Sequence, residues 1–332
     1  MNKKAQMSSP FSYIFALIIG GIVFMFLIGF AYKFIALSGA LSAAETVTAL
    51  NDEFAAFSVS ESAEKIINYG SSFDFTVFEG KITSEGQSQV IGEIIYAPYE
   101  IQGKDLYVAT RSLEMPYRVG NLFYLSDGSV IYILVYDSNT EEVVEELTDS
   151  YSAIPSNFPR EAFSITQVAS NIEELSQLTA SYDQVRFVFF TSYDNVIDDI
   201  QSNFVNYDIL KVESSDDEYN FGQVEYSDGE EVVYLGYPML IGAIVSFNAY
   251  SYNYNFDLVM GKLSSVTNVY YDKSKFISAR KPECDYNSIK TTLSNYKSLA
   301  NQEEVSYNSY STKIEQVESA NDGLGGDCPE IF

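Results

Sequence analysis

The sequence predicts a mixed α/β (α+β) protein carried on an N-terminal transmembrane helix. Three observations support this: an uncharged apolar run near the N-terminus, apolar patterns in the middle that alternate between strand and helix periods, and two helical stripes near the C-terminus. We expect a cytoplasmic N-terminus (1–10), a transmembrane helix (11–32), a helical stalk (33–70), an extracytoplasmic α/β domain with a mixed sheet (71–282) and a C-terminal helical hairpin (283–332).

Composition excludes several classes of function. The chain of 332 residues has 46 acidic and 19 basic side chains, a net charge of −27, which argues against nucleic-acid partners and against docking onto anionic lipid. It has no histidine, so Ser-His-Asp and Cys-His catalysis and His-ligated zinc are excluded. Its two cysteines cannot form a Cys₄ site, and we expect no cofactor and no metal.

The run at residues 11–32, bounded by Phe11 and Tyr32, predicts a membrane anchor. Its 22 residues would form a helix of about 33 Å, long enough for the hydrocarbon core of a bilayer. Lys3 and Lys4 precede the run, so the positive-inside rule places the N-terminus in the cytoplasm and the rest of the chain outside. A cleaved secretory signal is the alternative, because small residues at 36–44 fit a cleavage site.

The residues before this helix resemble a known kind of signal. Lys-Lys-Ala-Gln-Met-Ser at positions 3–8 is similar to the class III (prepilin-type) signal of archaeal pilins and pilin-like surface proteins. The resemblance implies a cut between Ala5 and Gln6 that leaves the helix on the mature protein, available for self-association. The family usually has Gly where this chain has Ala5, and many members have Glu where it has Pro10. The remaining layout resembles uncharacterised membrane-anchored archaeal proteins.

The predicted stalk has an apolar seam at alternating spacings of three and four residues. Such a seam has to be buried, either against the protein's own domain or in a coiled coil or filament core. Ser58 and Glu61 have the spacing of a capping box, which predicts a further short helix ending at Gly70. The seam comprises Ala40, Ala43, Val47, Leu50, Phe54 and Phe57.

Strand patterns begin at Phe73. Phe73, Phe75 and Val77 alternate with polar residues, and further strands are expected at 90–96 and 106–109. Two Asp-Gly turns, at 127–128 and 228–229, predict β-hairpins, because this dipeptide accepts the positive φ angles of a tight turn. The first hairpin would join 121–125 to 130–136, and the second 223–226 to 232–235.

Between these turns the pattern is β-α-β-α-β, which favours parallel pairing. The run at 185–190 is nearly continuously apolar, as in a strand covered on both faces. Strands are expected at 163–168, 185–190 and 207–212, helices at 171–182, 194–204 and 256–269, and a core segment at 239–247.

Near the C-terminus, two helical stripes lie between Cys284 and Cys328. A single helix over 285–319 would be about 52 Å long, and the remaining tail of at most about 30 Å could not return Cys328 to Cys284. Paired cysteines are the simplest state in an exterior compartment, so we expect a hairpin that turns near Asn301. Two buried free thiols are the alternative.

No motif for nucleotide binding or hydrolase chemistry is present. We therefore expect a non-enzymatic, single-pass membrane protein that acts at the cell surface in interaction or envelope structure, with a protein or envelope partner. A pilin-like filament subunit and a carboxylate-dependent surface hydrolase are the alternatives. Three acidic groups lack the calcium-loop pattern: Asp194/Asp198/Asp199, Asp216/Asp217/Glu218 and Asp228/Glu230/Glu231.

Overall fold

A computed structural model of the chain describes residues 24, 25, 28, 48, 50–84, 87–148, 154–193, 196–214, 216, 218–302, 306–326 and 328–332. The predicted signal site, Ala5 and Gln6, and the predicted anchor from Phe11 to Tyr32 lie outside these residues, apart from positions 24, 25 and 28. Within the described part, no helix combines the length and the apolar character needed to cross a bilayer.

The first half of the chain forms a six-stranded mixed sheet, sheet A. Its order is β3-β2-β1-β5-β6-β4, and all neighbours are antiparallel except β4 and β6. Its strands are β1 (Ser62–Phe78), β2 (Lys81–Ser84), β3 (Gln87–Val90), β4 (Ile94–Tyr96), β5 (Glu100–Glu114) and β6 (Arg118–Ser126).

Strand β1 starts much earlier than predicted, and the short helix expected after Ser58 and Glu61 is wrong. Residues 62–68 pair antiparallel with residues 105–111 of β5. The adjacent pair Ile66 and Ile67 gave no clear alternation, so local pattern could not reveal a strand whose stability comes from backbone pairing with a distant partner.

A helical segment at residues 50–57 packs against one face of sheet A. Leu50 and Phe54 are fully buried, Phe57 packs beside them, and the rings of Phe54 and Phe123 meet edge to face at 5.0 Å. These residues of the predicted seam are therefore buried by the protein's own domain. Ala40, Ala43 and Val47 lie outside the described residues.

The second sheet, sheet B, has the order β12-β11-β10-β9-β7-β8. The predicted parallel pairing is confirmed, because β8, β7, β9 and β10 are all parallel neighbours. Hairpin β11–β12 is also confirmed. The strands are β7 (Val130–Tyr136), β8 (Arg160–Ser164), β9 (Gln184–Phe189), β10 (Tyr207–Ser214), β11 (Phe221–Tyr226) and β12 (Glu231–Leu235).

The two helices predicted in this region, 171–182 and 194–204, are shorter in the structure, and two further helices were not predicted. Strand β8 ends at Ser164 because this residue forms a capping box with Gln167 and starts a helix inside the expected strand 163–168. The helices are α2 (Glu141–Thr148), α3 (Ile165–Ser170), α4 (Ile172–Leu178) and α5 (Ile197–Asn203).

The hairpin predicted between residues 121 and 136 is wrong. The turn exists, with Gly128 at φ 78°, but it carries the chain from sheet A into sheet B. Strand β6 already has β5 and β4 as neighbours, so it offers no edge to β7. Strand β7 is almost entirely apolar and lies between β8 and β9, which suits a strand covered on both faces.

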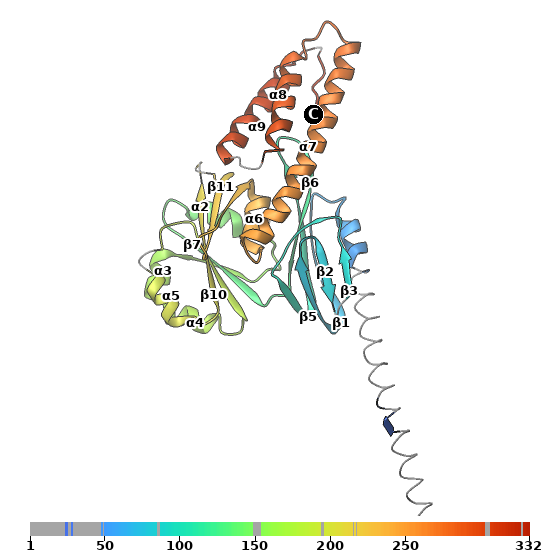
Figure 1. Cartoon of the computed structure of the whole chain (residues 1–332). Coiled ribbons are helices and arrows are strands. Elements are labelled where there is room, and N and C mark those ends of the chain that lie inside the picture. Colours follow the sequence, from blue (N-terminus) through green and yellow to red (C-terminus); the bar gives the residue numbers. More distant parts are fainter. Residues whose placement is uncertain are drawn as a thin grey trace, which may run out of the picture.

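Helix α6 (Tyr237–Val245) lies between the two sheets (Figure 1). It is apolar on all sides, and its residues from Met239 to Val245 are buried, as expected for the predicted core segment. Gly242 is needed for this packing, because a Cβ there would lie 2.8 Å from the ring of Tyr96. That ring stacks on Tyr124 and Tyr252 at centroid distances of 6.0 and 5.6 Å.

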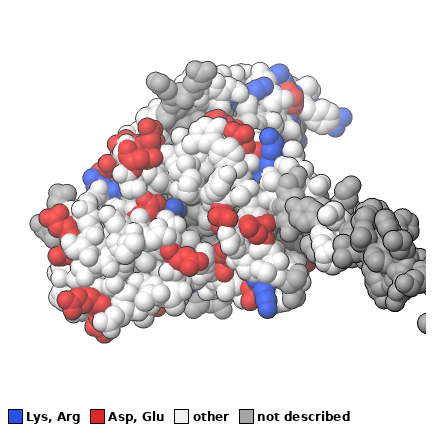
Figure 2. Space-filling view, turned by 60° about the horizontal axis from the view of Figure 1, so that its bottom comes forward, with Lys and Arg blue, Asp and Glu red and all other residues white. Residues whose placement is uncertain are grey.

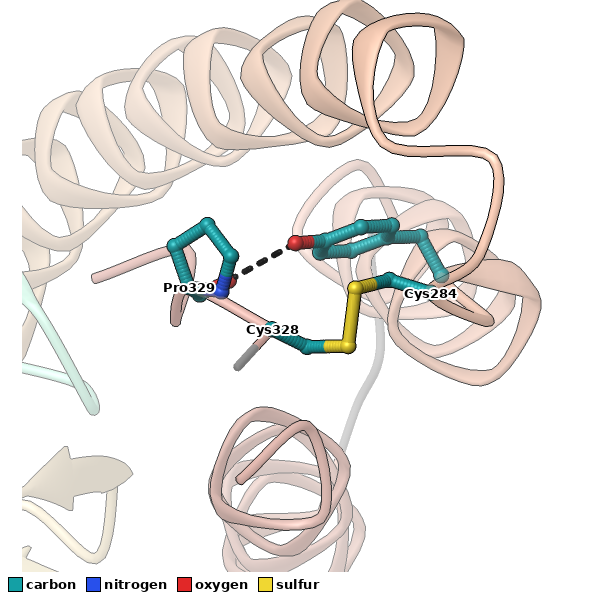
Figure 3. Close-up of a disulfide and its surroundings, with 4 residues drawn as sticks. Cys284, Cys328 and Pro329 are labelled. Carbon is teal, nitrogen blue, oxygen red and sulfur yellow. Dashed lines mark hydrogen bonds between the residues drawn. A yellow bond between two sulfur atoms is a disulfide. The ribbon is translucent and has the colours of Figure 1, made fainter. Parts of the chain in front are cut away.

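Three C-terminal helices project beyond the sheets, at the top of Figure 1. They are α7 (Ala249–Arg280), α8 (Asn287–Leu299) and α9 (Tyr307–Asp322). The predicted hairpin is present as α8 and α9, and α7 is far longer than the expected 256–269. A disulfide joins Cys284 to Cys328, beside the Tyr286 hydroxyl, which donates to Pro329 O at 3.0 Å (Figure 3).

Removing the disulfide should destabilise the protein. The bond spans a sequence separation of 44 residues, for which chain entropy gives about 4 kcal/mol of stability. We expect Cys284→Ser/Cys328→Ser to lower the melting temperature, and added reductant to lower that of the wild type but not that of the variant. An unchanged melting temperature of the wild type in reductant would show that the disulfide does not stabilise the protein.

Gly242→Ala should destabilise the protein by about 1–3 kcal/mol, because the added methyl group overpacks the interface with Tyr96. Gly261→Ala on α7 is the matched control, since its Cβ would meet nothing within 4 Å. That control should stabilise the helix by roughly 0.5–1 kcal/mol. Denaturant unfolding of both variants measures the difference, and equal effects would refute the packing argument.

Candidate functional site

Four exposed aromatic side chains meet on the surface where sheet A borders the start of α7. Phe78, Tyr99, Phe247 and Tyr250 are 38, 44, 47 and 57 % exposed. Ring centroids are 6.1 Å apart for Phe78 and Tyr99, 5.7 Å for Phe78 and Tyr250, and 5.4 Å for Tyr99 and Phe247. We call these four residues the aromatic platform. Contiguous exposed apolar surface of this kind marks interaction sites.

The turn between β1 and β2 positions one side of the platform. Glu79 and Gly80 both have positive φ angles, 48° and 65°, and this tight turn exposes Phe78. The Tyr250 hydroxyl donates to the Glu79 carboxylate at 2.6 Å. That hydrogen bond, together with the charge of Glu79, raises the pKa of Tyr250 above its ordinary value.

Backbone hydrogen bonds join the remaining segments. Val77 N donates to Tyr99 O at 3.0 Å, and Phe247 N donates to Ala97 O at 3.2 Å. The Asn248 side chain caps α7, so Tyr250 lies in the first turn of a rigid helix. Each ring is therefore attached to ordered backbone.

A buried arginine holds the corner that carries Phe247. Arg186, on β9, donates to Ile244 O at 2.7 Å, Ser246 O at 2.6 Å and Phe247 O at 3.3 Å. It also forms an ion pair with Asp208 on β10 at 3.0 Å. The guanidinium thus satisfies carbonyl groups at the end of α6, where a helix leaves such groups unpaired.

The side chains of the platform are suited to binding. Its rings offer apolar area and π faces, and the tyrosines add hydroxyl groups. Two carboxylates, Glu79 and Glu100, and one ammonium group, Lys81, come from the same turn and strand ends. The exposed faces and hydroxyl groups of these rings are suited to recognition.

A separate groove of about 810 Å³ lies between β12, α7 and the ends of the α8–α9 connection. Two carboxylates line it, Glu231 on the edge strand β12 and Asp257 on α7, and both are exposed. Phe256, Asn301 and Tyr310 also line it, so the groove combines polar and aromatic groups.

The predicted acidic groups remain apart. Asp198 and Asp199 lie in the first turn of α5, Asp228 closes the β11–β12 turn by accepting from Glu230 N at 3.1 Å, and Asp216 accepts from two backbone N–H groups of its own loop. Asp194 and Asp217 lie outside the described residues. Among the residues described, no group of three potential metal ligands occurs. Figure 2 shows acidic side chains in separate clusters over one face.

Neither the platform residues nor Arg186 were among the residues expected to form a site. The abundance of tyrosine and phenylalanine was the only signal for the former, because its four residues come from three separated segments. For Arg186 a signal existed: it is a lone cation inside the apolar run of β9, and a buried charge needs partners.

Arg186→Met should destabilise the protein by about 3–5 kcal/mol, since it leaves three carbonyl groups without their donor and the partly buried Asp208 without its cation. Lys211→Met, which removes the exposed pair with Glu213 on the same sheet, should cost about 1 kcal/mol or less. Denaturant midpoints compare the two variants. Equal midpoints would show that Arg186 is not a structural anchor.

Comparison with known proteins found no matching family model, no matching curated protein and no matching solved structure.

Proposed function

We propose that the chain is a single-pass membrane protein that displays a non-enzymatic binding domain at the cell surface. The observation that carries this proposal is the aromatic platform, in which four partly exposed rings are held by ordered backbone. Rings fixed before binding lose little conformational entropy when a partner docks, which favours recognition.

The proposed location rests on two features. The disulfide between Cys284 and Cys328 suits an oxidising exterior compartment, because such bonds are rare in the cytosol. The uncharged run at residues 11–32, preceded by Lys3 and Lys4, suits an anchor with its N-terminus inside. Both features are consistent with a domain that lies outside the membrane.

A pilin-like filament subunit is the second candidate, and its support is the signal-like segment around Ala5 and Gln6. The packing of Leu50, Phe54 and Phe57 on sheet A favours the anchored protein instead. In a filament subunit, the filament core would bury the whole seam, and these three residues form its C-terminal half.

A carboxylate-dependent hydrolase would have Glu231 and Asp257 of the groove as its candidate residues. A catalytic acid of this kind needs a pKa raised by burial, so that it carries a proton at neutral pH. Both carboxylates are exposed, which favours a binding role for the groove.

The test is the mature N-terminus together with the side of the membrane on which the domain lies. Mass analysis should find a terminus at Met1 or Asn2, as expected for an unprocessed anchor. Protease added to intact cells should digest the domain. A terminus at Gln6 would favour the pilin route instead.

One control and two alternative outcomes make this test decisive. A cytoplasmic protein in the same cells should resist the protease until lysis, which shows that the membrane was intact. If the domain also resisted until lysis, display at the surface would be refuted. A mature terminus after residues 36–44 would instead identify a cleaved secretory signal and a released domain.

A further inference from the structure

We propose that the aromatic platform binds a lysine- or arginine-rich segment of a protein partner. This inference rests on the proposed function, because it names the class of partner that the displayed domain recognises. It follows from three observations: the accessibility of the rings, the absence of a cation over them among the described residues, and the charge of the surrounding surface.

The rings have the geometry that cations bind. An ammonium or guanidinium group is attracted to the face of Phe or Tyr within about 6 Å of the ring centre. The chain makes such contacts elsewhere: Lys275 lies 3.9 Å from the centre of Tyr271, and Arg280 lies 3.8 Å from that of Phe276.

No cation of the described part of the chain lies over a ring of the platform. Among the residues that the structure describes, the cations that lie over rings all belong to the distal half of α7. The faces left exposed on the four rings are therefore available to a cation from another molecule.

The negative charge of the protein favours a positively charged partner. The chain has a net charge of −27, so a second copy and an anionic lipid surface are both repelled. At the platform, Glu79 and Glu100 directly follow Phe78 and Tyr99 in the chain, and Lys81 pairs with Phe78 across the turn. A basic segment would place its charges near these carboxylates and its side-chain stems on the rings.

The Glu79 carboxylate has a defined place in this surface. It accepts the hydrogen bond from the Tyr250 hydroxyl, so a negative charge is fixed at the rim of two rings that stack 5.7 Å apart, Phe78 and Tyr250. A carboxylate beside π faces suits an ammonium or guanidinium group better than a neutral sugar, which gains nothing from the charge.

The probe is a fluorescent 16-residue peptide of alternating lysine and glycine, titrated into the full-length protein in detergent. The matched probe is the same peptide with every lysine acetylated, which keeps the stems and removes the charges. We expect the charged peptide to bind and the acetylated peptide to bind at least ten-fold more weakly.

General attraction to an acidic protein must be separated from binding at the rings. Tyr99→Leu/Phe247→Leu removes two π faces without changing the charge, and should weaken binding about ten-fold, or roughly three-fold for each ring. Phe276→Leu is the matched control, because Phe276 is 55 % exposed on the distal half of α7 and should leave affinity unchanged. Glu79→Gln keeps all four rings and should weaken binding two- to three-fold, which covers the case in which the double variant does not fold.

Three results would overturn the proposal. The first is equal binding of the charged and the acetylated peptide, and the second is wild-type affinity in both the folded Tyr99→Leu/Phe247→Leu variant and the Glu79→Gln variant. The third is binding of neutral chitohexaose at the platform without binding of the charged peptide. These results are independent of the protease test, since binding in detergent does not depend on which side of the membrane the domain occupies. Failure of the partner class and failure of surface display are therefore distinguishable.

Discussion

The ion pair between the buried Arg186 and the partly buried Asp208 is the interaction on which the arrangement of the two sheets depends. Removing a charge from water is costly, and hydrogen bonds from the remaining donors offset part of that cost. Here the two terminal nitrogens of Arg186 donate to the carbonyl groups of residues 244, 246 and 247, while its Nε has no partner among the described residues. The centre of sheet B is thereby joined to the end of α6, which lies against both sheets, and to the start of α7. The same contacts position Phe247 of the aromatic platform.

Much of the secondary structure could be predicted from the sequence where its signal is local. The apolar run of β9 indicated a strand covered on both faces, and the two C-terminal stripes with Cys284 and Cys328 indicated a closed helical hairpin. Pairing partners could not be predicted in the same way. The Asp-Gly turn at 127–128 has the local chemistry of a hairpin, yet its strands belong to different sheets, because β6 is already paired on both edges.

The candidate site was less predictable than the fold, and for a related reason. A surface cluster has no sequence period: Phe78 follows a strand, Tyr99 precedes one, and Phe247 and Tyr250 flank the start of a helix. Each residue alone fits ordinary core packing. Only the close approach of three distant segments separates a partly exposed cluster from the many aromatic residues that are buried, such as Tyr96 and Tyr124.

The disulfide has a consequence for a domain exposed to proteases. Helices α8 and α9 both lie inside the covalent ring closed by Cys284 and Cys328. A single nick at any peptide bond within that ring opens the chain without releasing a fragment, because both new ends stay tethered through sulfur. The segment beyond the ring is also held, since Ile331 is buried and the ring of Phe332 contacts Tyr117 and Tyr270 at 5.1 and 5.6 Å. This end of the protein therefore tolerates chain cleavage that would dismantle an open helical pair.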